Sequence, residues 1–324
     1  LSQRPESPMV VKAAGTELGI PYRHNALERF PFSFYFGPNH YNTLKQYDLE
    51  LEEIIPTGWS IFSYINKWLV IPLFNGLGGL NMGWVILLLT IVVKVLLLPI
   101  AFKTYMSGAR MRLLKPETDA LNAKYGKQGD PMKKQQEVMA LYRKAGVNPM
   151  AGCLPMLLQM PILYAMFRFF PASIELRQEG FLWADDLSSY DSIYNFGFEI
   201  PFYGDHISLF TLLMAASTFL YTKTNSSMTA MSGPQASQMK IMMYLMPVML
   251  LGFFNNYSAG LSYYYFLANC ISMLQQVVIK NWFIDENAIH LQIQENKKKP
   301  VKKSNFQKRL EDMAKQRGYQ GPKK

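Results

Sequence analysis

The sequence predicts an all-α polytopic membrane protein, and three observations support this fold class. Apolar residues make up 49% of the 324 and gather in five blocks, with most of the charged residues between the blocks. The Lys and Arg residues are concentrated in alternate connections, and no Asp or Glu lies inside a block. A helix needs about 20 apolar residues to cross a bilayer. We expect spans at about 82–102, 151–171, 207–222, 239–255 and 261–283.

The connections predict the orientation of these spans. The 103–150 connection carries ten Lys and Arg residues against four acids, whereas 172–206 carries one arginine against seven acids. Connections rich in Lys and Arg stay in the cytoplasm, so we expect an exported N-terminal segment, a periplasmic loop at 172–206 and a cytoplasmic C-terminus. The chain opens without a signal sequence, and we expect an upstream signal anchor and most of an exported domain to precede it.

Two segments precede the first span. Residues 1–56 are expected to be the end of a periplasmic β domain with its linker, because aromatic runs around the Gly-Pro-Asn at 37–39 predict strand, turn, and then helix or strand. Residues 57–80 predict an amphipathic helix at the membrane interface. Its apolar face would carry Trp68, and its polar face would carry Asn66. A sixth span is the alternative for this segment.

The cytoplasmic parts are expected to be helical and basic. Residues 103–148 predict a helical hairpin, in which Pro116 kinks or divides the first helix and Pro131 begins the second. Residues 285–324 form a basic cytoplasmic tail whose low apolar content argues against an independent fold. Its lysines suit contact with anionic lipid and, equally, with RNA phosphates.

Lys94 is the residue that most needs an explanation. A lysine deep in a span costs about 2.5–3.5 kcal/mol. Lys94 lies eight residues before Phe102, about 12 Å along a helix, which is farther than its side chain can reach. Polar residues in other spans could be its partners, although each alone is explained equally well by hydrogen bonding between helices. Together with Lys94 they predict a hydrated, positively charged groove, and the candidates are Thr90, Gln159, Tyr264, Tyr265, Asn269 and Gln275.

No enzyme, cofactor or metal site is expected. The sequence lacks the HExxH, GxSxG, P-loop and dinucleotide-binding motifs, and both cysteines lie in the predicted spans. A transporter or channel would use the same groove, but it predicts carboxylates within the membrane and paired broken helices. A scaffold for assembling membrane complexes predicts instead that Lys94 tolerates neutral replacement.

Several motifs resemble the YidC/Oxa family of membrane protein insertases. The stretch VNPMAGCLPMLLQMPI at 147–162 resembles the family's third-span signature, and ALYRKAGVNP at 140–149 resembles its cytoplasmic hairpin. FYFGPNHY at 34–41 is similar to the end of the exported domain of Gram-negative members. The resemblance covers about 34–283. It implies a five-helix insertase core at 81–284 around a hydrophilic groove, in the bacterial inner membrane.

The resemblance also implies roles for residues and partners. Lys94 occupies the family's central groove position, where relatives commonly carry Arg, so a bidentate contact is replaced by a point charge. Thr90 and Tyr265 match groove residues, and Leu154, Leu158 and Met246 match the hydrophobic slide. The implied partners are nascent membrane proteins and the Sec translocon with its accessory subunits. Ribosomes or a targeting-factor receptor would meet the hairpin and the tail lysines, Lys297, Lys298, Lys299, Lys302 and Lys303.

Overall fold

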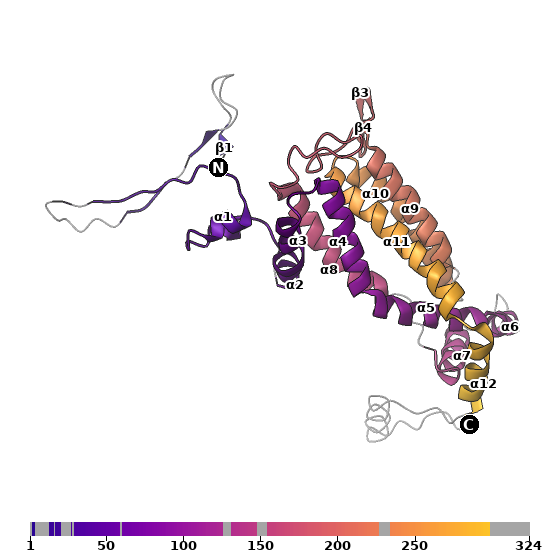
Figure 1. The fold of residues 1–324 in the computed structure, drawn as a ribbon. Helices are drawn as coiled ribbons and strands as arrows, with labels where there is room; N and C mark the ends of the chain where they lie inside the picture. Colours follow the sequence, from indigo (N-terminus) through magenta and orange to yellow (C-terminus); the bar gives the residue numbers. More distant parts are fainter. Residues whose placement is uncertain are drawn as a thin grey trace. The chain divides into compact units, whose positions relative to one another are not determined.

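The computed structural model describes residues 2–3, 13–15, 17–20, 27, 29–58, 60–125, 131–147, 154–226 and 234–298. The chain divides into two compact units, Leu1–Pro38 and Asn39–Lys324 (Figure 1). In the first unit, β1 (Ser2–Gln3) pairs antiparallel with β2 (Ala13–Ala14). The expected strand before the Gly-Pro-Asn is not formed, since 29–38 are neither helix nor strand. A strand needs neighbouring strands for stability, and neither sheet in the described residues includes this segment.

The second unit is mostly helical. Two elements precede the interfacial segment: α1 (Tyr41–Lys45) and the 3-10 helix η1 (Leu51–Ile54). The remaining elements outside that segment are α4 (Met82–Leu96), α5 (Leu98–Leu113), α6 (Lys115–Tyr125), α7 (Pro131–Lys144), α8 (Leu154–Phe169), the 3-10 helix η4 (Phe170–Ala172), β3 (Tyr194–Ile200), β4 (Gly204–Ile207), α9 (Leu209–Ser226), α10 (Pro234–Phe254), α11 (Ala259–Phe283) and α12 (Glu286–Lys298).

The interfacial segment is helical but packs through an unexpected face. It consists of α2 (Ile61–Ile65), a π-helical stretch η2 (Asn66–Val70) and α3 (Ile71–Gly76). Asn66 is fully buried and donates hydrogen bonds to the Thr57 carbonyl at 2.8 Å and to the Ala165 carbonyl of α8 at 3.0 Å. Trp68, by contrast, is 79% exposed. The assignment of Asn66 to the outer polar face was therefore wrong. A buried amide is stabilised by these two bonds, and hydrophobic periodicity does not show them.

The first predicted span is broken. α4 ends at Leu96 and α5 begins at Leu98, and the two axes are bent by 60°. Pro99 accounts for the break, because a proline has no N–H to donate to the carbonyl four residues earlier. Among the described residues, no single helix has both the length and the hydropathy of a membrane span, whereas α4 and α5 have them as a bent pair.

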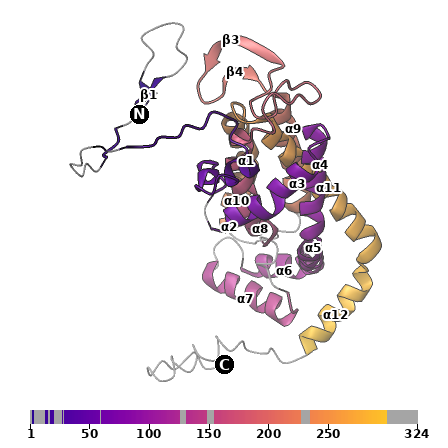
Figure 2. The same ribbon diagram turned by 60° about the vertical axis from the view of Figure 1, so that its left-hand side comes forward.

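α11 is the central helix of the second unit. It packs along α9 and α4, and α10 packs on α9. Figures 1 and 2 place the β3–β4 hairpin at one end of these helices, while α6, α7 and α12 lie at the other.

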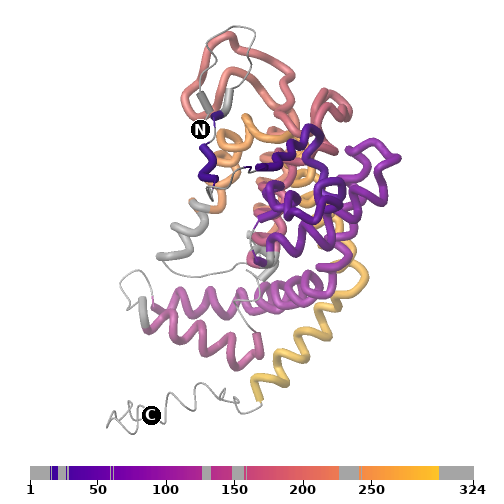
Figure 3. The backbone as a smooth tube through the Cα atoms, turned by 90° about the vertical axis from the view of Figure 1, so that its left-hand side faces the viewer, coloured from indigo at the N-terminus to yellow at the C-terminus, as the bar shows by residue number. Residues whose placement is uncertain are grey.

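The beginning of the tail is helical and packed, although its composition argues against an independent fold. α12 follows α11 and packs on the helical hairpin predicted at 103–148 (Figure 3). Ile289 and Ile293 are four residues apart, so they share one helix face, and they are 4% and 2% exposed. They join a core that includes Leu114, Val138 and Tyr142 of the hairpin. The tail does not need a core of its own, because the hairpin supplies one.

Candidate functional site

Lys94 lies where α4, α8 and α11 meet. Its Nζ donates a hydrogen bond to Gln159 Oε1 at 3.4 Å, and Gln159 Nε2 donates to the Tyr264 hydroxyl at 3.2 Å. Lys94 is half-buried, whereas Tyr264 is fully buried. Gln275, a further residue of α11, donates to the backbone carbonyl of Lys94 at 3.2 Å. Four of the residues predicted to line the groove are therefore brought together.

The charge of Lys94 is not neutralised within the described part of the chain. No carboxylate there lies within 4.0 Å of its ammonium group. An ammonium group has three donor hydrogens, and the described residues supply one acceptor, the neutral Gln159 amide, at the long end of hydrogen-bond distances. Water or an acidic ligand can therefore take the remaining donors. This arrangement can bind an anion.

Two predicted groove residues do not present their hydroxyl groups to Lys94. Thr90 is fully buried, and its Oγ1 donates to the Ile86 carbonyl of the same helix at 2.7 Å. Short hydroxyl side chains commonly make this bond inside helices. The Tyr265 ring packs on Phe254 with 6.1 Å between centroids, and its buried hydroxyl has no hydrogen-bond partner among the described residues.

Asn269 belongs to another interface, between α9 and α11. Its Nδ2 donates to Ser217 Oγ at 3.1 Å and to Thr218 Oγ1 at 2.8 Å. Thr211 and Ser262 share a hydrogen bond one heptad earlier, and Gln276 donates to Asn225 one heptad later. All three pairs are separated by 51 residues along the chain.

Pairs at a constant sequence separation, repeated every seven residues, are typical of parallel helices in register. This polar ladder fixes α9 against one side of α11. Asn269 is therefore part of the frame that holds α11, and it does not contact Lys94.

The hydrophobic slide is only partly described. Met246 on α10 is 44% exposed. Leu154 and Leu158 belong to α8, but their side chains lie outside the described residues. Leu157 and Met160 on α8 are 62% and 52% exposed, and neither was predicted to belong to the slide. Apolar spacing alone could not distinguish these outward positions from inward ones.

The tail lysines differ in their surroundings. Lys297 pairs with Glu117 of α6 at 2.5 Å, whereas Lys298 is exposed. Lys299, Lys302 and Lys303 lie outside the described residues. The ion pair of Lys297 helps to hold α12 on the hairpin, although an exposed pair contributes only about 0–1 kcal/mol.

A buried polar cluster at the β3–β4 end was missed by sequence reasoning. Asp191 is 2% exposed and accepts hydrogen bonds from Ser208 Oγ at 2.5 Å, from the Leu209 and Phe210 amides at 2.8 and 3.1 Å, and from Trp183 Nε1 at 2.9 Å. The carboxylate thus caps the first turn of α9, where the amides lack helical partners. A capping residue normally stands next to its helix, and Asp191 is too far away in sequence for that signal.

The described residues contain no group of three His, Cys, Asp or Glu side chains that could hold a metal ion.

Comparison with known proteins identifies the family. The family described as 60Kd inner membrane protein matches residues 73–287, which include Lys94, Gln159 and Tyr264. A membrane protein insertase YidC of Parabacteroides distasonis is 47% identical over 317 residues, covering 94% of this chain and 50% of the relative. One from Bacteroides fragilis is 51% identical over 294 residues, covering 87% and 47%. The chain therefore spans about half the length of the curated relatives it matches.

A solved structure, the active YidC insertase with its first transmembrane domain resolved, is 25% identical. It matches 76% of this chain and 54% of its own with a TM-score of 0.49. The family match alone covers about two thirds of the sequence. The chain accordingly belongs to the YidC family of membrane protein insertases, the 60Kd inner membrane proteins.

Proposed function

We propose that the chain forms the core of a membrane protein insertase, in which Lys94 receives the acidic or polar flank of a client protein. The observation that carries this proposal is a lysine ammonium group held between three helices with one neutral partner and no carboxylate among the described residues. The function of the relatives, which are named insertases, supports it.

Magnitudes favour a role for the charge itself. Placing one aspartate at the centre of a bilayer costs about 2.5–3.5 kcal/mol on insertion scales. Two unit charges 4 Å apart attract by about 4 kcal/mol at an effective dielectric constant of 20. A client carboxylate beside Lys94 therefore recovers an amount comparable to its cost of entry. Binding lowers the barrier, and no covalent chemistry is needed.

The apolar part of the client would lie along the outer surfaces of α8 and α10. Exposed side chains there include Leu157 and Met160 on α8, with Val248 and Met249 on α10. An apolar segment in contact with these residues remains next to lipid while its polar flank is held by Lys94. We propose that Leu154, Leu158 and Met246 extend the same surface.

The remaining parts complete the proposal. The α4–α5 pair, α8, α9, α10 and α11 would form five spans in the inner membrane, with the 172–206 loop periplasmic and the hairpin and tail cytoplasmic. We propose that the Sec translocon and its accessory subunits act alongside this core. The hairpin and exposed tail lysines such as Lys298 would meet ribosomes, a targeting-factor receptor or anionic lipid.

Substitution of Lys94 tests the proposal. Lys94→Ala, Lys94→Glu and Lys94→Arg would be expressed in cells depleted of the native protein, and insertion of a single-span client with an acidic exported tail would be followed by protease protection. We expect Ala and Glu to slow insertion about tenfold or more, since 1.36 kcal/mol is tenfold in rate, and Arg to restore it. Lys280→Ala, at an exposed lysine of α11, is the matched control. Normal insertion by Lys94→Ala at equal expression would contradict the proposal.

A further inference from the structure

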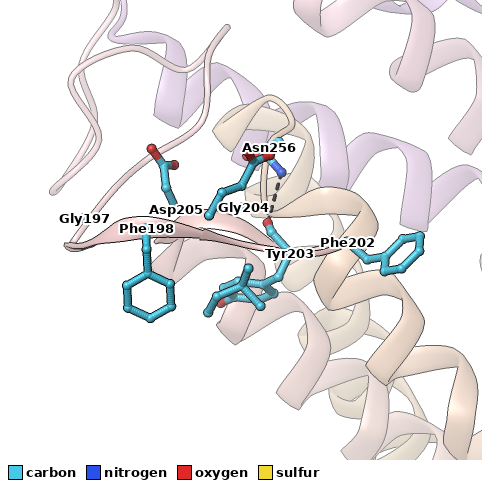
Figure 4. A pocket seen from close by; sticks show the side chains of 9 residues that line it. Gly197, Phe198, Phe202, Tyr203, Gly204, Asp205 and Asn256 are labelled. Atoms are coloured by element: carbon cyan, nitrogen blue, oxygen red, sulfur yellow. Dashed lines mark hydrogen bonds between the residues drawn. The ribbon is translucent and has the colours of Figure 1, made fainter.

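The β3–β4 hairpin carries an aromatic face. The ring centroids of Tyr194 and Phe196 are 5.6 Å apart, and those of Phe196 and Phe198 are 5.8 Å apart, so alternate residues of β3 form one row. Tyr194 and Phe198 are 60% and 64% exposed. Figure 4 shows Phe198 pointing to one side of the hairpin and Asp205 pointing to the other. The hairpin is thus apolar on one face and acidic on the opposite face.

The hairpin is fixed to the helices that follow it. His206 is 1% exposed, and its Nε2 lies 2.9 Å from the Asn255 carbonyl. Asn255 Nδ2 in turn donates to the carbonyls of His206 at 2.8 Å and of Tyr203 at 3.0 Å. Asn256 donates to the same Tyr203 carbonyl at 3.0 Å (Figure 4). Because the turn at Tyr203 and strand β4 at His206 are both bonded to the residues that follow α10, the hairpin keeps a defined position relative to α10.

Phe202 connects the hairpin to the apolar surface of α10. Its ring is 99% exposed. Its carbonyl oxygen lies against Gly252 of α10, where an added Cβ would come within 2.7 Å of it. Val248 and Met249 lie about one helical turn before Gly252 and are 62% and 66% exposed, and Phe253, the next residue after Gly252, is 59% exposed. An exposed apolar surface therefore continues from α10 onto the tip of the hairpin.

We propose that the β3–β4 hairpin is a membrane anchor whose aromatic face lies in the exported leaflet of the bilayer, at the boundary of headgroups and acyl chains. This inference rests on the membrane topology of the proposed function. Phe202 extends the exposed apolar surface of α10. The proposed topology places that surface of α10 against lipid, so the hairpin tip would lie against lipid as well. Aromatic residues are enriched at this boundary, and the opposite, acidic face with Glu199 and Asp205 remains in water. The anchor would hold the 172–206 loop at the exported end of the helices.

Depth measurements test the anchor without any client. Single cysteines replacing Phe198 or Phe202 would be placed in the chain with Cys153 and Cys270 changed to Ser, labelled with a nitrobenzoxadiazole dye, and reconstituted in vesicles of phosphatidylethanolamine and phosphatidylglycerol. We expect quenching by nitroxide lipids with a depth of about 5–10 Å into the headgroup–acyl boundary. Glu199→Cys, the neighbouring residue on the opposite face, is the matched control and should be quenched by aqueous iodide instead.

A label at Val248 separates this inference from the proposed function. Lipid quenching at 248 together with iodide quenching at 198 and 202 would overturn the anchor and leave the span intact. Iodide quenching at all of these positions would overturn the proposed topology as well. Protection of 198 from both quenchers, lost on dilution into excess lipid, would show a second copy of the chain on this face and would also overturn the anchor.

Discussion

Replacing Asp191 with alanine should destabilise the β3–β4 end of the protein. The carboxylate accepts four hydrogen bonds, two of them from the first amides of α9. Removing a buried acceptor leaves each donor with a desolvation cost of about 1–3 kcal/mol, although water entering the cavity reduces the total. Loss of a helix cap alone costs about 0.5–2 kcal/mol. We therefore expect Asp191→Ala to lower the free energy of unfolding by about 3–5 kcal/mol.

Thermal unfolding of the purified chain in detergent, followed by circular dichroism at 222 nm, measures this effect. At about 2.1 cal/mol/K of unfolding entropy per residue, a loss of that size in a chain of 324 residues lowers the midpoint by roughly 4–7 °C. Glu199→Ala is the matched control, because it removes an exposed carboxylate from the same loop and should change stability by less than about 0.5 kcal/mol. Equal midpoints for the two variants would refute the assignment of Asp191 as the cap of α9.

Three other predictions concern separate parts of the fold. Asn269→Leu should lower stability by about 0.6–1.7 kcal/mol through the loss of one step of the α9–α11 ladder, and an unchanged midpoint in detergent would exclude the ladder as a stabilising contact. Ile293→Asp should release α12 and speed tryptic cleavage after Lys298, whereas Leu291→Asp, at a 65% exposed position, should not. At Asp186, burial acts to raise the pKa, but hydrogen bonds from the Ser188 hydroxyl and from backbone amides outweigh it and hold the pKa below its usual value. Asp186→Asn should therefore be less stable than the parent at pH 7, and the difference should shrink as pH falls below about 4, the unfolded pKa; a constant difference across this range would contradict the sign.

Sequence reasoning found the parts of the site that violate hydrophobic periodicity. Lys94 and Gln159 are polar residues in apolar blocks, so each needed a partner, and the structure places them in contact. Sequence reasoning could not tell which neighbouring helix each polar residue faces. Asn269 has the same character as Gln159, yet it lies on the α9 side of α11. That choice depends on the rotation of α11 about its axis, which only the packed neighbours determine.

Other features depend on contacts between segments far apart in sequence. Asn66 is buried because a carbonyl of α8 accepts its hydrogen bond. Ile293 is buried because the helical hairpin predicted at 103–148 covers it. Neither partner is near in sequence, so local pattern assigned Asn66 to a polar outer face and Ile293 to a tail without a core. Most of the helices themselves follow from local pattern, but Pro99 divides the first predicted span and α12 forms in the tail, where no helix was predicted.

Reversing the charge at position 94 and in the client's exported tail tests the central claim most directly. Insertion of two matched single-span clients, one with an acidic and one with a lysine-bearing exported tail, would be compared in the parent chain and in Lys94→Glu by protease protection. If Lys94 receives the client's flank through its charge, Lys94→Glu should lose the acidic client and gain the basic one. If both clients insert equally well in both chains at equal expression, the charge of Lys94 does not select the client, and the proposed mechanism is wrong.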